Sequence, residues 1–139
     1  MLNLSKGIYG KLSGSALASH IGTRMYGGRA KQGAAYPYVV YLIPSDVPDP
    51  TFSSNYEDYL IQFSLFSSTS SSTEVKNMYT DLKTLYDDCT MTIAAGANTL
   101  IWMQRVNATL MAEEHTLPTP IGTVKVWHLA VDYMATVKV

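Results

Sequence analysis

Alternation of apolar residues near the end of the chain constrains the fold more than any other feature. From position 127 to 137 every odd-numbered residue is apolar or aromatic, namely Trp127, Leu129, Val131, Tyr133, Ala135 and Val137. Successive side chains of a strand point to opposite faces of a sheet, so this pattern predicts a strand over about 124–137 with one buried face. Another strand is predicted over about 100–112. Both exceed the usual five or six residues, and an open edge on such strands favours pairing with another chain.

Two earlier segments also favour strands. An apolar run over 38–43, opened by Pro37, is rich in β-branched and aromatic residues. Over 58–67 a second alternation predicts a core-facing set of Tyr59, Ile61, Phe63 and Leu65. Between them, residues 44–56 hold three prolines and are too long for a tight turn, which predicts a protruding arm or a functional loop.

Three helices are expected. One covers about 2–13, with Leu4, Ile8 and Leu12 on one face, and a short one covers 16–21. The clearest covers about 75–89 after a Ser71–Glu74 capping box. Its apolar stripe predicts a core face made of Val75, Met78, Tyr79, Leu82, Leu85, Tyr86 and Cys89. Cys89 is then a buried, inert thiol, and two acids at the helix end, Asp87 and Asp88, indicate a cationic partner there.

These elements give the order α-β-β-α-β-β. The expected fold class is α+β, an antiparallel-rich sheet of about four strands with helices packed on one face. Residues 22–36, with four glycines, and 113–122, with two prolines, are expected to be connections. A length of 139 residues suits one domain over 1–139.

The composition points to a covered surface. Charged residues make up 15% of the chain, against about 25% in typical domains, beside 47% hydrophobic residues and 10 tyrosines. This indicates either partners over part of the surface or a monomer with a bland surface. Residues 1–40 carry five cations and no acid, whereas residues 41–88 carry eight acids against two lysines. Such segregation suits a basic patch on one subunit meeting an acidic patch on another, unless folding mixes the charges in space.

Several classes of protein are disfavoured by simple counts. A net charge of −1 argues against a dedicated nucleic-acid binder. One cysteine excludes an intrachain disulfide and fits a reducing cytoplasm, and no apolar run has the length of a signal peptide or membrane span.

The search for catalytic motifs finds none. There is no nucleophile elbow, phosphate-binding P-loop, zinc-protease motif or dinucleotide fingerprint, and His20, His115 and His128 lack metal-ligand spacing. We therefore predict no catalytic residue, metal or cofactor. A small enzyme pairing Cys89 with a histidine is the remaining alternative. Glu113 and Glu114 are adjacent on a strand end and are expected to form a solvated corner. Residues 27–33, GGRAKQG, suit either an anion-binding loop or a sharp bend before a strand.

Residues 22–40 read GTRMYGGRAKQGAAYPYVV. This segment resembles the signature of the tail-completion, or tail-terminator, family of long-tailed bacteriophages, and the order of elements resembles that family over nearly the whole chain. The resemblance implies a non-enzymatic virion protein. Proteins of that family assemble as a hexameric ring at the head-proximal end of the tail, end polymerisation of the tail tube and join tail to head, so the same is expected of this chain. A head-completion or neck adaptor, or a tail-tube-like ring protein at a neighbouring position, is the alternative.

The resemblance also directs attention to two sets of residues. Arg24, Arg29 and Lys31 are expected either at subunit interfaces or lining a central channel through which DNA passes. Asp46, Asp49, Phe52 and Tyr56 are expected to contact the adjacent tube or neck ring. The implied partners are further copies of this chain, the tail tube protein and a head-proximal connector protein, with no membrane. The implied location is the virion, with assembly in the host cytoplasm.

Overall fold

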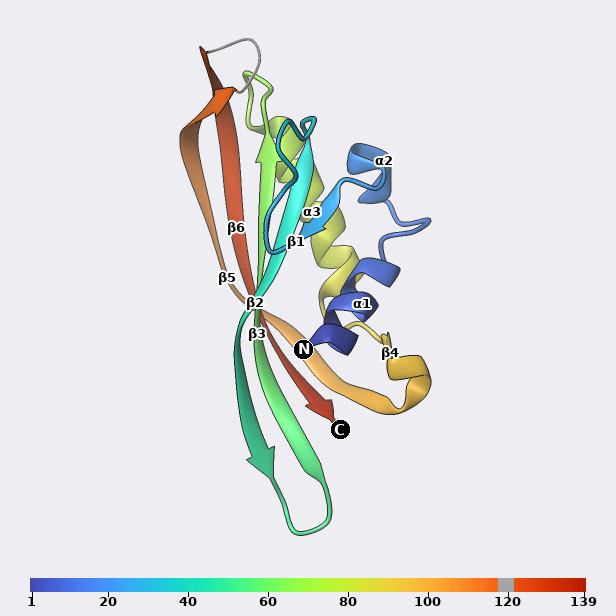
Figure 1. Ribbon diagram of the computed structural model, residues 1–139. Helices are drawn as coiled ribbons and strands as arrows, with labels where there is room; N and C mark the ends of the chain where they lie inside the picture. The colour runs from blue at the N-terminus through green and yellow to red at the C-terminus, as the bar shows by residue number, and fades with distance from the viewer. Residues whose placement is uncertain (118–121) are drawn as a thin grey trace.

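The computed structural model describes residues 1–117 and 122–139, and its architecture is one curled sheet with helices on one side (Figure 1). The helices are α1 (Leu2–Gly10), α2 (Ala18–Ile21), α3 (Thr73–Tyr86) and the short 3-10 helix η1 (Ala94–Gly96). The strands are β1 (Met25–Gly27), β2 (Tyr38–Pro50), β3 (Asn55–Ser67), β4 (Thr92–Ile93), β5 (Asn98–Leu117) and β6 (Gly122–Lys138).

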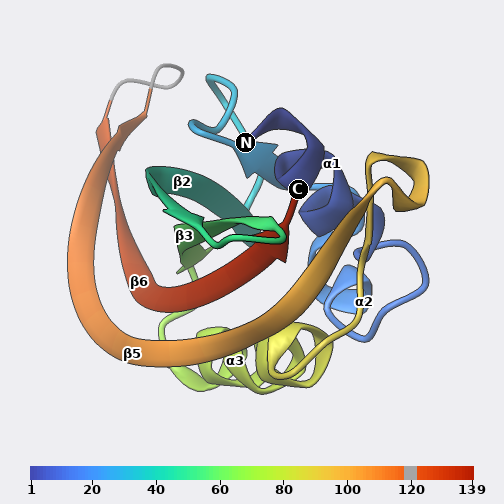
Figure 2. The same cartoon turned by 90° about the horizontal axis from the view of Figure 1, so that it is seen from below.

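The described strands form one mixed sheet in the order β1-β2-β3-β6-β5-β4. β1 runs parallel to β2, and every other neighbouring pair is antiparallel. Seen from below, the long strands β5 and β6 follow an arc, so the sheet is a half-barrel and not a flat layer (Figure 2). The α+β class and the helices on one side are therefore confirmed, and the sheet has six strands instead of about four.

The core lies between this sheet and the helices. All four residues predicted for the inner face of β3 are buried, as are the odd-numbered residues of β6 from Leu129 to Val137. They pack against the stripe of α3 and the apolar face of the first helix in one cluster that includes Leu4, Ile8, Leu12, Val75, Met78, Leu82 and Tyr86. Cys89 lies beyond the end of α3 and is half-buried.

The predicted capping box at α3 is wrong. The helix begins at Thr73, after Ser72, whose side chain makes no capping hydrogen bond, and the hydroxyl of Ser71 accepts from the N–H of Thr73 at 3.2 Å instead of forming the predicted reciprocal pair with Glu74. The carboxylate of Glu74 instead accepts a hydrogen bond, 2.7 Å long, from the hydroxyl of the buried Ser67. The same hydroxyl lies 3.0 Å from that of Thr69, so these groups form a small polar network at the start of α3, while water can satisfy the exposed end of the helix.

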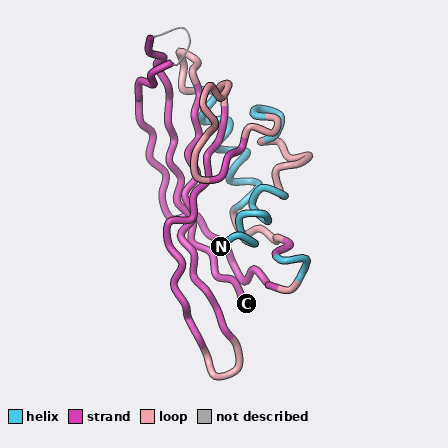
Figure 3. Tube along the Cα trace, in the orientation of Figure 1, coloured by secondary structure: helices cyan, strands magenta, loops and turns pink. Residues whose placement is uncertain are grey.

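Residues 44–56 form a protruding arm, one of the two predicted alternatives, but most of the segment is paired strand and not the loop that was expected. β2 pairs with β3 as far as Pro50 and Asn55, and only residues 51–54 form the turn. β1 covers the outer edge of β2 only at Val39–Tyr41, so the prolines lie on an uncovered edge, where a missing N–H leaves no ladder bond unmade. Figure 3 shows this arm as strand almost to its tip.

Two expected connections contain more strand than predicted. β1 lies inside the glycine-rich segment 22–36, and β5 runs to Leu117 within the predicted connection 113–122. β6 begins at Gly122, and the rest of that connection, 118–121, lies outside the described residues. The β5–β6 pair is therefore longer than expected, because its pairing extends to Leu117 and Gly122.

Candidate assembly surfaces

The basic loop, residues 28–37 between β1 and β2, contains two of the three predicted cations. Arg29 and Lys31 are exposed, and neither has a carboxylate within ion-pair distance among the described residues. Arg24 precedes β1 and is half-buried. Its guanidinium donates to the carbonyl of Pro37 at 2.9 Å and to that of His20 at 3.2 Å. Arg24 therefore fixes the start of β2 against α2, and the other two cations are free for contacts.

A polar cluster anchors the basic loop to the sheet. The hydroxyl of Tyr36 lies 2.7 Å from Nδ1 of His115, and the two carboxylate oxygens of Glu113 lie 3.2 Å from His115 Nε2 and 2.8 Å from His128 Nδ1. Phe66 stacks on the ring of His128 at a centroid distance of 4.3 Å. Partial burial raises the pKa of Glu113, but the two histidine hydrogen bonds outweigh it and leave this pKa below its ordinary value.

The cluster corrects the prediction that Glu113 lies at a solvated corner. In the β5–β6 ladder Met111 lies opposite His128 and Glu113 opposite Val126, which puts Glu113 diagonal to the histidine on the same face. The only hint that the sequence offers is a glutamate and a histidine two residues apart, Glu113 and His115, just beyond the end of a predicted strand. Because the register between β5 and β6 is invisible in the sequence, the partnership with His128 was missed.

The hairpin arm, residues 44–58, carries the acidic set. Asp46 and Asp49 are exposed, Tyr56 is half-buried, and the side chain of Phe52 in the turn is fully exposed at 114%. The arm and the basic loop lie at opposite ends of β6. Tyr56 pairs with Lys138 at one end, whereas Lys31 lines a pocket of about 440 Å³ beside Leu117, which pairs with Gly122 at the other. The two exposed cations of the basic loop and the two exposed acids of the arm are thus separated in space.

The outer edge of β5 is a third surface. β5 pairs with β6 along its length but with β4 only at Asn98 and Thr99. Near its start, Asp88 covers the edge by donating its N–H to the Met103 carbonyl at 3.0 Å, and Arg105 binds Asp87 at 3.2 Å. The cation expected beside Asp87 thus comes from the chain itself. The apolar side chains that β5 exposes are Ile101, Trp102, Val106, Leu110 and Met111.

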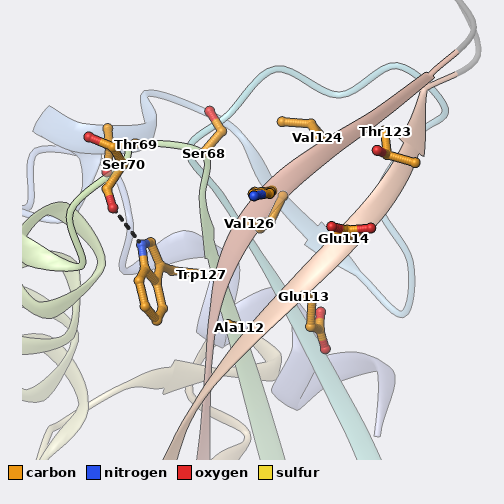
Figure 4. A pocket seen from close by; sticks show the side chains of 11 residues that line it. Ser68, Thr69, Ser70, Ala112, Glu113, Glu114, Thr123, Val124, Val126 and Trp127 are labelled. Atoms are coloured by element: carbon orange, nitrogen blue, oxygen red, sulfur yellow. Dashed lines mark hydrogen bonds between the residues drawn. The ribbon is translucent and has the colours of Figure 1, made fainter.

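A groove of about 760 Å³ lies where β3 ends and β6 continues (Figure 4). Its lining consists of Ser68, Thr69, Ser70, Ala112, Glu113, Glu114 and residues 123–127. The indole N–H of Trp127 donates to the carbonyl of Ser70 at 3.4 Å across one end of the groove. Sequence reasoning missed this groove because it depends on where one strand outlasts its neighbour.

The enzymatic alternative finds no support in the geometry. Burial raises the pKa of the Cys89 thiol, and its sulfur lies 3.9 Å from that of Met103. His20 bonds to Asp81 at 2.6 Å, and the other two histidines belong to the cluster around Glu113. Among the described residues no group of three or more His, Cys, Asp or Glu side chains is arranged so that it could hold a metal ion, and no helix is long and apolar enough to cross a membrane.

Comparison with solved structures identifies the fold. A chain from the virion of a native gene transfer agent particle superposes with a TM-score of 0.75 at 13% identity, covering 99% of this chain and 96% of its own. A second structure aligns with a TM-score of 0.49 at 12% identity, over 96% of this chain and 91% of its own, and contributes nothing to the assignment. No curated protein matches significantly.

Comparison with protein-family models identifies the family. The match covers residues 6–138, which include all the surfaces described above. It agrees with the resemblance noted in residues 22–40 and extends it across the whole sheet. The chain belongs to the family described as tail completion protein gp17.

Proposed function

We propose that copies of this chain form a closed hexameric ring at the head-proximal end of the tail. There the ring ends polymerisation of the tail tube and joins tail to head. Its family makes the chain a tail completion protein, a structural component of a phage-like virion and not an enzyme. The ring, its six-fold symmetry and its position are the proposal.

The observation that supports a ring is the presence of unlike contact surfaces on one chain. A closed ring needs heterologous contacts, in which two different patches of neighbouring subunits meet. The chain offers free cations at one end of β6, free acids on the arm at the other, and an open, apolar β5 edge. Complementary charges of this kind fix the register of association more than they add affinity.

We assign the two ends of the molecule different roles. Arg29 and Lys31 contact the neighbouring subunit or line the channel, where they meet DNA phosphates, and Arg24 orients their loop through its bonds to two carbonyls. The arm, with Asp46, Asp49, Phe52 and Tyr56, contacts the adjacent tube or neck ring. Its exposed phenyl ring suits an anchor that becomes buried in a partner's pocket.

The test is the mass of the particle with and without its tail tube. Six copies of a 15.3 kDa chain give about 92 kDa, measured by light scattering and by electron microscopy of the protein bound to purified tubes. The double variant Arg29→Glu/Lys31→Glu should lose ring formation or function, whereas the control Lys76→Glu, also exposed but on α3, should keep both. A wild-type protein that stays monomeric and also fails to bind tubes refutes the proposal. Binding to the head connector but not to tubes favours a neck adaptor instead.

A further inference from the structure

The pocket of about 440 Å³ beside the basic loop combines aromatic rings with a free cation, and we call it the tyrosine pocket. The loop forms one wall and the end of β5 forms another, and the lining includes Lys31, Gln32, Tyr36, Tyr38, His115 and Leu117. The volume falls in the range of about 300–1,000 Å³ that sites for small molecules occupy. The roles assigned above to the basic loop concern its charges and leave the rings of this pocket without one.

The aromatic part of the pocket is held in place by the protein itself. The ring of Tyr36 packs on that of Tyr38 at a centroid distance of 5.1 Å, and Tyr38 packs in turn on Phe66 at 4.9 Å. The hydroxyl of Tyr36 bonds to Nδ1 of His115 at 2.7 Å, which fixes the orientation of the ring. Tyr36 is only half-buried, so part of its surface is free. A ring that is already oriented loses little freedom on binding, which favours the stacking of a flat ligand on it.

A tight turn brings polar groups to the edge of the pocket. The N–H of Ala34 donates to the carbonyl of Lys31 at 3.2 Å, and Gly33 between them has a φ of +75°, which glycine adopts without strain. Lys31 and Gln32 are therefore held beside the rings, and both are exposed. An ammonium group suits a phosphate, and the amide of Gln32 both donates and accepts hydrogen bonds, as the edge of a nucleobase does.

The pocket keeps a positive edge although acids are close to it in the sequence. Lys31 has no carboxylate within ion-pair distance among the described residues, and residues 118–121, which lie outside them, include no Asp or Glu. Glu113 has both carboxylate oxygens bonded to histidines, and Glu114 lies on the opposite face of β5 from His115. Aromatic rings beside unpaired positive charge are typical of sites for single-stranded nucleic acid. An acidic peptide would use the cation but not the rings.

The ligand that uses both features is a nucleotide with an unpaired base. Within a duplex a base is covered by its neighbours in the stack and bonded to its pair, whereas a base in a single-stranded overhang has free faces and a free edge. We propose that the tyrosine pocket holds an unpaired nucleotide at the end of the DNA, with its base stacked on Tyr36, its edge beside Gln32 and its phosphate beside Lys31. This inference deepens the channel-lining role within the proposed function and rests on that function for the route by which DNA reaches the pocket.

Binding of a labelled single-stranded oligonucleotide, measured by fluorescence anisotropy at several salt concentrations, tests the pocket. Tyr36→Leu removes the stacking surface and should weaken binding about 5- to 150-fold without changing its salt dependence. Tyr36→Phe keeps the ring while losing the bond to His115, so it should retain most of the affinity. Lys31→Ala should instead reduce the slope of log K against log salt by about 0.7. The controls Tyr9→Leu and Lys76→Ala change exposed residues of α1 and α3 and should bind as the wild type does.

Three results would overturn the proposal. One is a wild-type protein that binds no oligonucleotide, and another is equal binding before and after Tyr36→Leu, which would mean attraction by charge alone. The third is equal affinity for a blunt duplex and for the same duplex with a single-stranded overhang. Light scattering on the same samples separates this question from ring closure. A monomer that binds the overhang through Tyr36 counts against the ring alone, whereas a ring that binds no oligonucleotide counts against the pocket alone.

Discussion

Replacing Tyr86 with phenylalanine tests how the helices are tied to one another. Tyr86 is the last residue of α3 and has no exposed surface. Its ring stacks on Phe63 at a centroid distance of 4.7 Å, and its hydroxyl donates to the carbonyl of Ile8 at 2.7 Å. That carbonyl belongs to the last turn of α1, where the helix itself supplies no donors. The Tyr86 hydroxyl, at the end of α3, therefore supplies a hydrogen-bond donor to the C-terminal end of α1.

The structure sets the size of the expected effect. Tyr86→Phe keeps the stacked ring and removes one buried hydrogen bond, which leaves the Ile8 carbonyl without this donor. An unsatisfied buried group of this kind costs about 1–3 kcal/mol of unfolding free energy. For a domain of this size we expect the melting temperature to fall by roughly 4–12 °C. The matched control is Tyr9→Phe, because Tyr9 is exposed on α1 and should change stability by less than about 0.5 kcal/mol.

Alkaline titration gives a second readout for the same variant. Burial raises the pKa of Tyr86 well above that of an unfolded tyrosine, so the folded state keeps its proton after the unfolded state has lost it. Its contribution to stability is complete below about pH 10 and declines by about 1.4 kcal/mol per pH unit above it. Urea unfolding of Tyr86→Phe should therefore show a shallower decline than the wild type. If Tyr86→Phe had the stability of the wild type at pH 7 and lost stability equally steeply above pH 10, the reasoning would be refuted.

Three further predictions concern Glu113, Glu74 and Phe52. Hydrogen bonds from two histidines lower the pKa of Glu113, so its contribution to stability is present above about pH 4.5 and is lost as the pH falls through its folded-state pKa. Glu113→Gln should therefore lower the urea midpoint at pH 7 and make the loss of stability at acidic pH less steep. Glu74→Ala removes the shorter of the two hydrogen-bond contacts of the buried Ser67 hydroxyl, leaves the contact with Thr69, and should cost about 1 kcal/mol in thermal unfolding. Phe52→Ser should leave the melting temperature unchanged but weaken binding to purified tail tubes in a pull-down, because the side chain touches solvent only.

Periodicity predicted the parts of the fold that face the core. The alternation around Ile61 identified buried residues correctly, and so did most of the alternation around Val131 and of the stripe through Leu82, because burial on one face of an element leaves its period in the sequence. The exceptions, which are only half-buried at the margin of the core, are Tyr79, Leu85, Cys89 and Trp127. The fold class followed from the order of these elements. The boundaries followed less well, since apolar periodicity fades where a strand runs past the core, as in the arm and the last residues of β5.

What the sequence did not predict depends on which strands are neighbours. The prolines of the arm argue against strand only if their N–H positions face another strand, and at Pro48 and Pro50 they lie on the outer side of an uncovered edge. The cluster around Glu113 and the groove beside Trp127 both arise from the register of β5, β6 and β3. Register between distant segments is set by tertiary packing, which no single stretch of residues contains.

The two edges of the sheet explain how a weakly charged surface can serve specific assembly. The edge of the arm has prolines where an added strand needs donors, so this edge is poorly suited to extending a sheet, and the contact that we propose for the arm relies on side chains such as Asp49 and Phe52. β5, by contrast, has neither proline nor lysine along its described length, and it exposes apolar side chains such as Val106 and Leu110. An edge of that kind is tolerable in a folded protein only when something covers it. In the proposed ring this weakly charged edge would meet a neighbouring copy through apolar area, whereas the exposed charges of the basic loop and of the arm would set the selectivity of contacts at the two ends of β6.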